Sequence, residues 1–187
     1  MKVVVIVDLE ATCWENKKET SEVIEIGAIK IDKEGNKKEF QAFVRPIINP
    51  ILSDFCKQLT GINQSDVDKA ETFDKVAADF IEFVGTSRVY SWGYYDKNQL
   101  MKDCHRNKIA WQFDHTSLKH EFAKLKKIKP CGIIGALKML DMSFEGAHHR
   151  GIDDVRNIFK VYKRIKESLP WYAYTTVNTF APIAQSG

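Results

Sequence analysis

The run of β-branched residues near the N-terminus constrains the fold more than any other part of the sequence. Residues 2–8 read KVVVIVD, and the apolar stretch ends at Asp8. A short apolar run rich in valine and isoleucine is typical of a strand that is buried on both faces. We therefore expect residues 2–8 to form a central strand of a sheet.

The pattern of the later segments indicates the fold class. A turn-forming stretch at 32–36 separates a second apolar segment from a third. The patterning predicts strands at 2–8, 23–31, 38–45, 87–92 and 111–114, and helices at 52–59, 72–85, 95–107, 116–126, 132–141 and 152–168. Three strands, then alternating helices and strands, then helices indicate an α/β fold, a mixed sheet with helices on both faces.

The chain is predicted to hold one domain. Its 187 residues fit one hydrophobic core, and no internal repeat or linker divides residues 1–169. Residues 170–187 carry no Asp, Glu, Lys or Arg, and we expect them to form an uncharged C-terminal tail. Three alternatives stay open for this tail: packing on the domain, contact with another chain, or disorder.

Charge and apolar content narrow the choice of partners. The formal net charge is +3, which permits nucleic acid as a partner but does not require it. The N-terminal apolar run is too short for a signal peptide, and no stretch approaches the roughly 18 apolar residues of a membrane span. We therefore expect a cytoplasmic protein without a membrane partner. The sequence identifies no protein partner.

The four cysteines are widely scattered and form no C-x-x-C pair, which argues against a structural zinc site. A domain of this size needs no disulfide. Free thiols are therefore the expectation for Cys13, Cys56, Cys104 and Cys131.

Two acids at the end of the first strand form the first chemical motif. Asp8 and Glu10 are two residues apart, a spacing that puts both side chains on one face of a strand. Adjacent carboxylates repel each other unless a cation lies between them. Their oxygen atoms suit magnesium or manganese. The alternative is a surface-facing acidic strand end.

A third acid follows the strand at 87–92. Residues 91–96 read SWGYYD, so a strand end and a glycine turn lead to Asp96 at the start of a helix. Asp96 is either a helix cap, which is common at this position, or a further ligand for the cation of Asp8 and Glu10.

The third motif is HHRGIDD at residues 148–154, where a polar loop enters a long helix. Acids in a first helical turn interact favourably with the helix dipole, which is one explanation for Asp153 and Asp154. The functional interpretation separates the two. We expect Asp154 to point toward the acids of the first strand and Asp153 to point away. His149 would lie above them as a base, with His148 on the other side of the loop.

The order and spacing of these motifs resemble the DEDDh exonuclease family, whose pattern is D-x-E, a mid-chain Asp, and a His followed by Asp five residues later. The sequence is closest to the subfamily of histone-mRNA-type 3′ exoribonucleases and their bacterial relatives. The stretches that carry the resemblance are DLEATC (8–13), EVIEIGAI (22–29), RPIINPILSDFCKQLTGI (45–62), SWGYYDKNQL (91–100) and HHRGIDDVRNI (148–158).

The resemblance implies a ribonuclease-H-like fold and a two-metal reaction. Two Mg²⁺ ions, or Mn²⁺ in their place, would be held by Asp8, Glu10, Asp96 and Asp154. Glu10 and His149 would be the catalytic residues, with His149 taking the proton of the attacking water. The reaction would remove nucleoside 5′-monophosphates from the 3′ end of single-stranded nucleic acid, with RNA favoured over DNA.

The resemblance also implies a set of nucleotide contacts: Glu10, Ala11, Thr12, Leu59, Ile62, Lys97 and His149. Leu59 and Ile62 would wedge against the last base, although ordinary core packing explains both equally well. Tyr95 and Lys97 would contact the penultimate nucleotide through stacking or charge.

Three other functions stay open. A DNA-directed exonuclease would use the same residues, because nothing in the sequence reads the 2′-hydroxyl that distinguishes RNA. A catalytically silent nucleic-acid or protein-interaction module is disfavoured, since all five motif residues are present. A phosphatase or nucleotidase could use the same metals.

Overall fold

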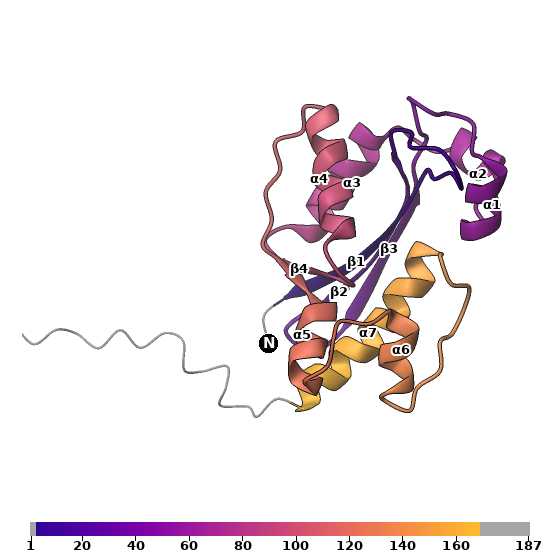
Figure 1. The fold of residues 1–187 in the computed structure, drawn as a ribbon. Coiled ribbons are helices and arrows are strands. Elements are labelled where there is room, and N and C mark those ends of the chain that lie inside the picture. The colour runs from indigo at the N-terminus through magenta and orange to yellow at the C-terminus, as the bar shows by residue number, and fades with distance from the viewer. Residues whose placement is uncertain (1–2, 169–187) are drawn as a thin grey trace, which may run out of the picture.

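A mixed sheet forms the centre of the molecule (Figure 1). The computed structural model describes residues 3–168. The sheet has five strands in the order β3-β2-β1-β4-β5. Pairing is antiparallel between β1, β2 and β3 and parallel between β1, β4 and β5. The strands are β1 (Val4–Ala11), β2 (Val23–Ile31), β3 (Lys37–Phe43), β4 (Arg88–Ser91) and β5 (His115–Ser117). The predicted mixed sheet is confirmed.

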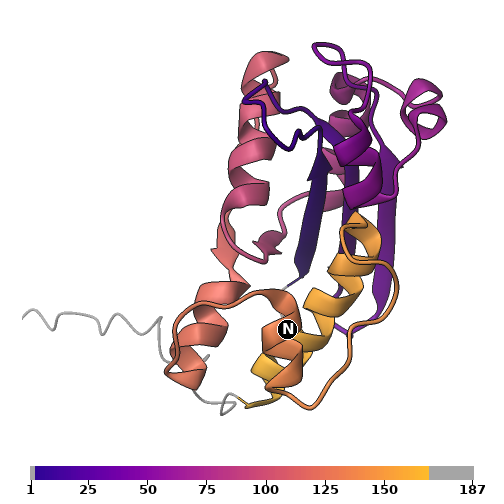
Figure 2. The ribbon, with the colours of Figure 1, turned by 45° about the vertical axis from the view of Figure 1, so that its right-hand side comes forward.

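Helices cover both faces of the sheet, as expected (Figures 1 and 2). The helices of the described residues are α1 (Asp54–Thr60), α2 (Gln64–Asp68), α3 (Phe73–Val84), α4 (Tyr95–Arg106), α5 (Leu118–Lys126), α6 (Ile133–Lys138) and α7 (Gly151–Ser168). Alternate residues of β1 enter opposite layers. Val5 and Val7 pack with α3 and α4, whereas Val4 and Ile6 pack with α5, α6 and α7. The central strand is therefore buried on both sides.

Strand β1 is longer than the sequence predicts. It continues past Asp8 to Ala11, with Asp8 opposite Gly27 and Glu10 opposite Glu25 of β2. The antiparallel partner supplies hydrogen bonds along this whole stretch, so the acids do not end the strand. Both acids therefore lie within the central strand of the sheet.

The predicted strand at 111–114 is wrong, because the strand is β5, a few residues later. Trp111 instead packs edge-on against Phe80 of α3, with ring centroids 5.8 Å apart. The backbone reaches the sheet at Asp114, whose carbonyl accepts the Val89 N–H at 2.8 Å. Helix α5 consequently begins after β5, later than residue 116. The aromatic side chains of this segment serve packing rather than strand pairing.

Helix α2 is absent from the sequence prediction. It has five residues, too few for a periodic pattern. Its start is fixed by a reciprocal cap, in which the Asn63 backbone N–H donates to the Asp66 carboxylate at 2.8 Å. Val67 of α2 and Ile62 just before the helix join Ile24 of β2 in a small apolar cluster. Short helices of this kind depend on such tertiary packing.

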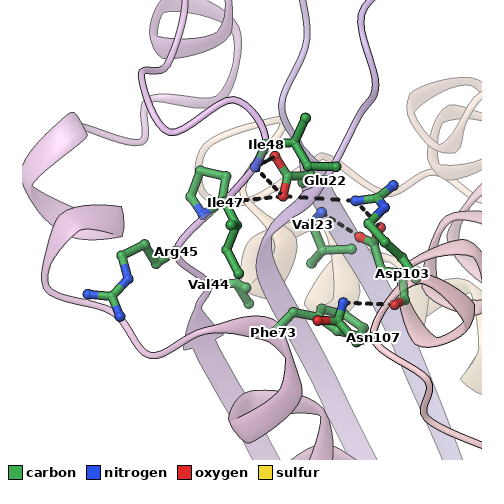
Figure 3. Close-up of a pocket in the computed structure, with 11 residues that line it drawn as sticks. Glu22, Val23, Val44, Arg45, Ile47, Ile48, Phe73, Asp103 and Asn107 are labelled. Carbon is green, nitrogen blue, oxygen red and sulfur yellow. Dashed lines mark hydrogen bonds and ion pairs between the residues drawn. The ribbon is translucent and has the colours of Figure 1, made fainter.

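The loop between β3 and α1 is held by a buried carboxylate (Figure 3). Glu22, just before β2, accepts the backbone N–H groups of Ile47, Ile48 and Asn49 at 2.8–3.0 Å. Arg106 of α4 lies 3.9 Å from the same carboxylate. Glu22, Ile47, Ile48 and Arg106 border a cavity of about 190 Å³. The carboxylates that border this cavity are already paired with backbone N–H groups and with Arg106. These contacts hold the loop in place.

The predicted boundary at residue 169 and the uncharged tail at 170–187 lie outside the described residues. Within residues 3–168, no helix is both long and apolar enough to cross a membrane. All four cysteines are free thiols, with Cys56 and Cys104 buried.

Candidate active site

Four acids from three separate segments of the sequence converge beside the central strand β1. Ligand oxygens of Asp8, Glu10 and Asp154 all lie within 4.8 Å of one another. Asp96, at the start of α4, joins them through Oδ1, which accepts the Leu9 backbone N–H at 3.2 Å. The structure therefore brings together all four acids that the sequence motifs single out.

A close approach of α7 to β2 places Asp154 beside the strand acids. A Cβ added at Gly27 would lie 2.3 Å from the backbone carbon of Gly151, so the residue at position 27 cannot carry a side chain without a shift. The fully buried carboxylate of Glu25 accepts the Gly151 N–H at 3.1 Å and lies 3.4 Å from Arg150 Nε. Sequence reasoning misses Glu25, although a charged residue inside an apolar strand is a signal.

The acids raise one another's pKa values. Burial raises the pKa of Asp8 well above its ordinary value, and Asp96, Asp154 and Glu10 raise it further. Burial, followed by Asp154, raises the pKa of Glu10 to about 8. Burial also raises the pKa of Asp96 to about 6 and shifts Asp154 upward. Such a group of buried oxygen ligands fits a hard divalent cation, which would neutralise the repulsion.

The loop before α7 presents His149 to these acids. Its backbone φ is 64°, a left-handed conformation that is uncommon outside glycine. Its backbone N–H donates to Asp154 Oδ2 at 2.8 Å. Asp153 points away, as expected: it accepts the Ala147 N–H at 3.0 Å and pairs with Arg156. Asp154 is thus oriented by the backbone of its own loop.

The expected separation of the two histidines is wrong. His148 Nε2 lies 3.7 Å from Asp154 Oδ1, and the two imidazole rings are 4.0 Å apart. The left-handed turn at His149 brings the rings to the same side, where an extended loop would have alternated them. His148 also packs edge-on against Phe144. Both histidines therefore face the acids.

A cavity of about 370 Å³ opens above the acids. It is lined by Asp8, Leu9, Glu10, Trp92, Tyr95, Asp96, Gly132, Ile133, His148, His149, Asp154 and Ile158. No sequence motif predicts that Ile133 of α6 and Ile158 of α7 line the cavity, because their positions depend on how the helices pack. The cavity joins both histidines and the acids in one space.

The predicted nucleotide contacts differ in their placement. Thr12 is buried, and its Oγ1 accepts the Glu22 N–H at 2.9 Å. Ile62 is fully buried in the cluster beside α2, which favours core packing for this residue. Leu59 is 38% exposed on α1 and is free to contact a ligand. Ala11 is buried and Lys97 is half-buried.

Comparisons of this chain with known proteins all indicate the same protein family. A sequence model described as Exonuclease matches residues 5–162. Human 3'-5' exoribonuclease 1 is 32% identical over 178 residues, which cover 86% of this chain and 51% of that protein. Xenopus laevis ERI1 exoribonuclease 2 is 30% identical over 195 residues, covering 86% of this chain but 28% of its own length. The chain thus spans about a quarter to a half of these two relatives.

A solved structure shows the same fold. The nuclease domain of 3'hExo, described as a DEDDh family member bound to rAMP, matches with a TM-score of 0.83 and 28% sequence identity. The match covers 89% of this chain and 92% of that one. The predicted ribonuclease-H-like fold is confirmed by this likeness. Family model, relatives and structure agree, and the chain belongs to the exonuclease family, in its DEDDh branch.

Proposed function

We propose that this domain is a 3′→5′ exonuclease that removes nucleoside 5′-monophosphates from single-stranded nucleic acid, with RNA favoured. The observation that carries the proposal is the convergence of Asp8, Glu10 and Asp154 within 4.8 Å beneath a cavity that also holds His149. Relatives named 3'-5' exoribonuclease support RNA as the substrate.

Divalent metals are general in this family, and we propose two Mg²⁺ ions for this site. Asp8, Glu10 and Asp154 would hold one ion, and Asp8 with Asp96 the other. When bound, the ions supply positive charge that stabilises the attacking and leaving oxygens. Mn²⁺ prefers the same oxygen ligands and would substitute.

We assign the general base to His149. Burial, followed by the neighbouring His148, lowers the pKa of His149, so its imidazole is neutral and able to accept a proton at neutral pH. Its left-handed backbone supports the assignment, because strained conformations concentrate at functional sites. Glu10 would act beside His149 by holding a metal ion and contacting the terminal nucleotide.

The 3′-terminal nucleotide would occupy the cavity above the acids. Its volume of about 370 Å³ suits a small ligand. Tyr95 would stack on the penultimate nucleotide, and Lys97 would contribute charge. Leu59 would contact the terminal base, with Ala11 and Thr12 behind it. Because α4, α6 and α7 border this space, a free end fits it better than the middle of a strand.

A digestion experiment tests this function. Matched RNA and DNA single strands, labelled at the 5′ end, are incubated with Mg²⁺, with Asp8→Asn as the control protein. We expect a ladder that shortens from the 3′ end, with nucleoside 5′-monophosphate as product, and no reaction in EDTA. Efficient cutting of a circular single strand would contradict the proposal, as would full activity in EDTA.

The same experiment decides the second candidate, a DNA-directed exonuclease. The cavity lining that we describe contains no group assigned to the 2′-hydroxyl, the feature by which proteins distinguish RNA. Faster digestion of the DNA strand than of the RNA strand would favour the DNA-directed exonuclease over the RNA-directed one.

A further inference from the structure

A group of aromatic rings, two exposed and one half-buried, continues from the rim of the cavity onto the neighbouring surface. Tyr95 lines the cavity, and Tyr94, the residue before it, is 51% exposed. The Tyr94 ring centroid lies 4.9 Å from that of His120 and 5.8 Å from that of His115. We call Tyr94, His115 and His120 the ring platform. It joins the start of α4 to β5 and α5.

The two imidazole rings of the platform are fixed by hydrogen bonds. His115 Nε2 lies 2.9 Å from the Ser91 hydroxyl of β4. His120 Nδ1 lies 2.7 Å from the Ser117 hydroxyl of β5. Each ring is thus tied to a strand of the sheet, so a ligand that stacks here meets side chains that have already lost much of their rotational freedom.

Helix capping does not account for Tyr94. It occupies the N-cap position of α4, yet its side chain makes no capping hydrogen bond. Ser, Thr, Asp and Asn are the residues that normally stabilise this position. Half of the tyrosine surface faces solvent. A residue that departs from the preference of its position, here the N-cap of a helix, without a compensating hydrogen bond is expected at a functional position.

A positive charge lies beside the platform. Burial lowers the pKa of His115 to about 4, and the charge of the nearby Lys97 of α4 lowers it further. The His115 ring is therefore neutral at neutral pH. Aromatic rings next to a cation are the combination that binds single-stranded nucleic acid without regard to sequence.

We propose that the ring platform binds bases of the substrate strand upstream of the two nucleotides nearest its 3′ end. This inference rests on the proposed exonuclease function. A strand whose 3′ end lies in the cavity must leave over its rim, and at Tyr95 the rim continues directly into Tyr94. Every base has a face that stacks, so the platform adds affinity for longer strands of any sequence.

The test compares short and long substrates. KM and kcat are measured for Tyr94→Ala and Tyr94→Phe with a dinucleotide and with a single strand of about ten nucleotides, a length within the usual site sizes. Met139→Ala is the control, because Met139, the residue directly after α6, is equally exposed. We expect Tyr94→Ala to raise KM for the long strand about 10-fold, the effect of losing one stacked base. Its kcat and its dinucleotide KM stay unchanged, and Tyr94→Phe behaves as wild type.

Two outcomes overturn the proposed role of the ring platform. In the first, Tyr94→Ala raises KM equally for the short and the long substrate. In the second, Tyr94→Ala leaves the KM of the long strand unchanged. If Tyr94→Ala does not fold, His120→Ala provides the same comparison of lengths, with the same expected direction. A wild-type protein that cleaves neither substrate would instead overturn the proposed exonuclease function, so the two failures are distinguishable.

Discussion

His149 combines an uncommon backbone conformation with a neighbour of the same residue type. A left-handed backbone costs a residue with a side chain about 1–2 kcal/mol, and here the N–H bond to Asp154 helps to hold it. The left-handed conformation at His149 orients both imidazole rings toward the acids. The structure therefore offers two bases within reach, and the resemblance to the family selects the one five residues before Asp154.

Single substitutions separate the two histidines. We expect His149→Ala to lower kcat by roughly 10²–10⁴-fold, the usual effect of removing a positioned general base, with little change in metal affinity. His148→Ala should keep most activity. Steady-state kinetics with Mg²⁺ titration measures both. A dead His148→Ala variant, or loss of metal binding in His149→Ala, would show that the role is misassigned.

The pH profile gives an independent check on the base. Burial and His148 lower the pKa of His149 below its ordinary value of 6.5, so kcat should rise with pH through an inflection below 6.5 and then level. His148→Ala removes one cause of the shift and should move the inflection upward. His149→Ala should lack it. An unchanged inflection in His149→Ala would assign the titration to another group.

The acids repel one another when no metal is bound, and Asp8 lies at their centre. Asp8→Asn should abolish activity while leaving the metal-free protein as stable as wild type or more so. It should also remove the rise in melting temperature that Mg²⁺ gives by binding the folded state. Glu34→Gln, in the exposed turn before β3, is the control. An unchanged metal-induced shift in Asp8→Asn would contradict the ligand assignment.

At the scale of the elements, the site depends on how α7 lies across β2. Gly27→Ala would place a methyl group 2.3 Å from the backbone of Gly151, so α7 must move and carry Asp154 with it. We expect a loss of about 1–3 kcal/mol in unfolding free energy and loss of activity. Chemical denaturation and the digestion assay measure the two effects.

Gly135→Ala in α6 is the matched control for Gly27→Ala. An added Cβ there meets Cys131 at 3.7 Å, an ordinary contact, and the change should stabilise the helix by roughly 0.5–1 kcal/mol. Equal behaviour of the two variants would show that the close approach at Gly27 is unimportant.

Long periodic segments could be predicted from the sequence, and elements fixed by tertiary contacts could not. Helix α3 follows Thr72 and ends before Gly85, as its pattern indicates. The extension of β1 depends on its partner strand, and β5 depends on where Trp111 packs. The four acids follow from motif spacing. The positions of Glu25 and His148 do not, since they result from the docking of α7 and a left-handed turn.

At the scale of the whole molecule, the buried acids couple stability to pH. Their folded-state pKa values are raised, to about 8 for Glu10 and about 6 for Asp96. These acids therefore hold more protons in the folded state than in the unfolded chain, and the stability they contribute falls as pH rises from 4 to 8. The lowered pKa values of His115 and His149 act in the opposite direction below 6.5, so the decline is clearest between pH 6.5 and 8. Melting curves in EDTA should show this decline, and Mg²⁺ should reduce it. Rising stability in EDTA from pH 6.5 to 8 would contradict it.

The site is shared between the two ends of the folded domain: β1 supplies Asp8 and Glu10, and α7 supplies Asp154. During synthesis, the ribosome releases the strand acids long before α7 has been made. Until that helix docks, a nascent chain holds an incomplete set of ligands and would lack the proposed hydrolytic activity. Contacts that span so much of the chain form slowly, so hydrolytic competence should be among the last properties that a newly made molecule acquires.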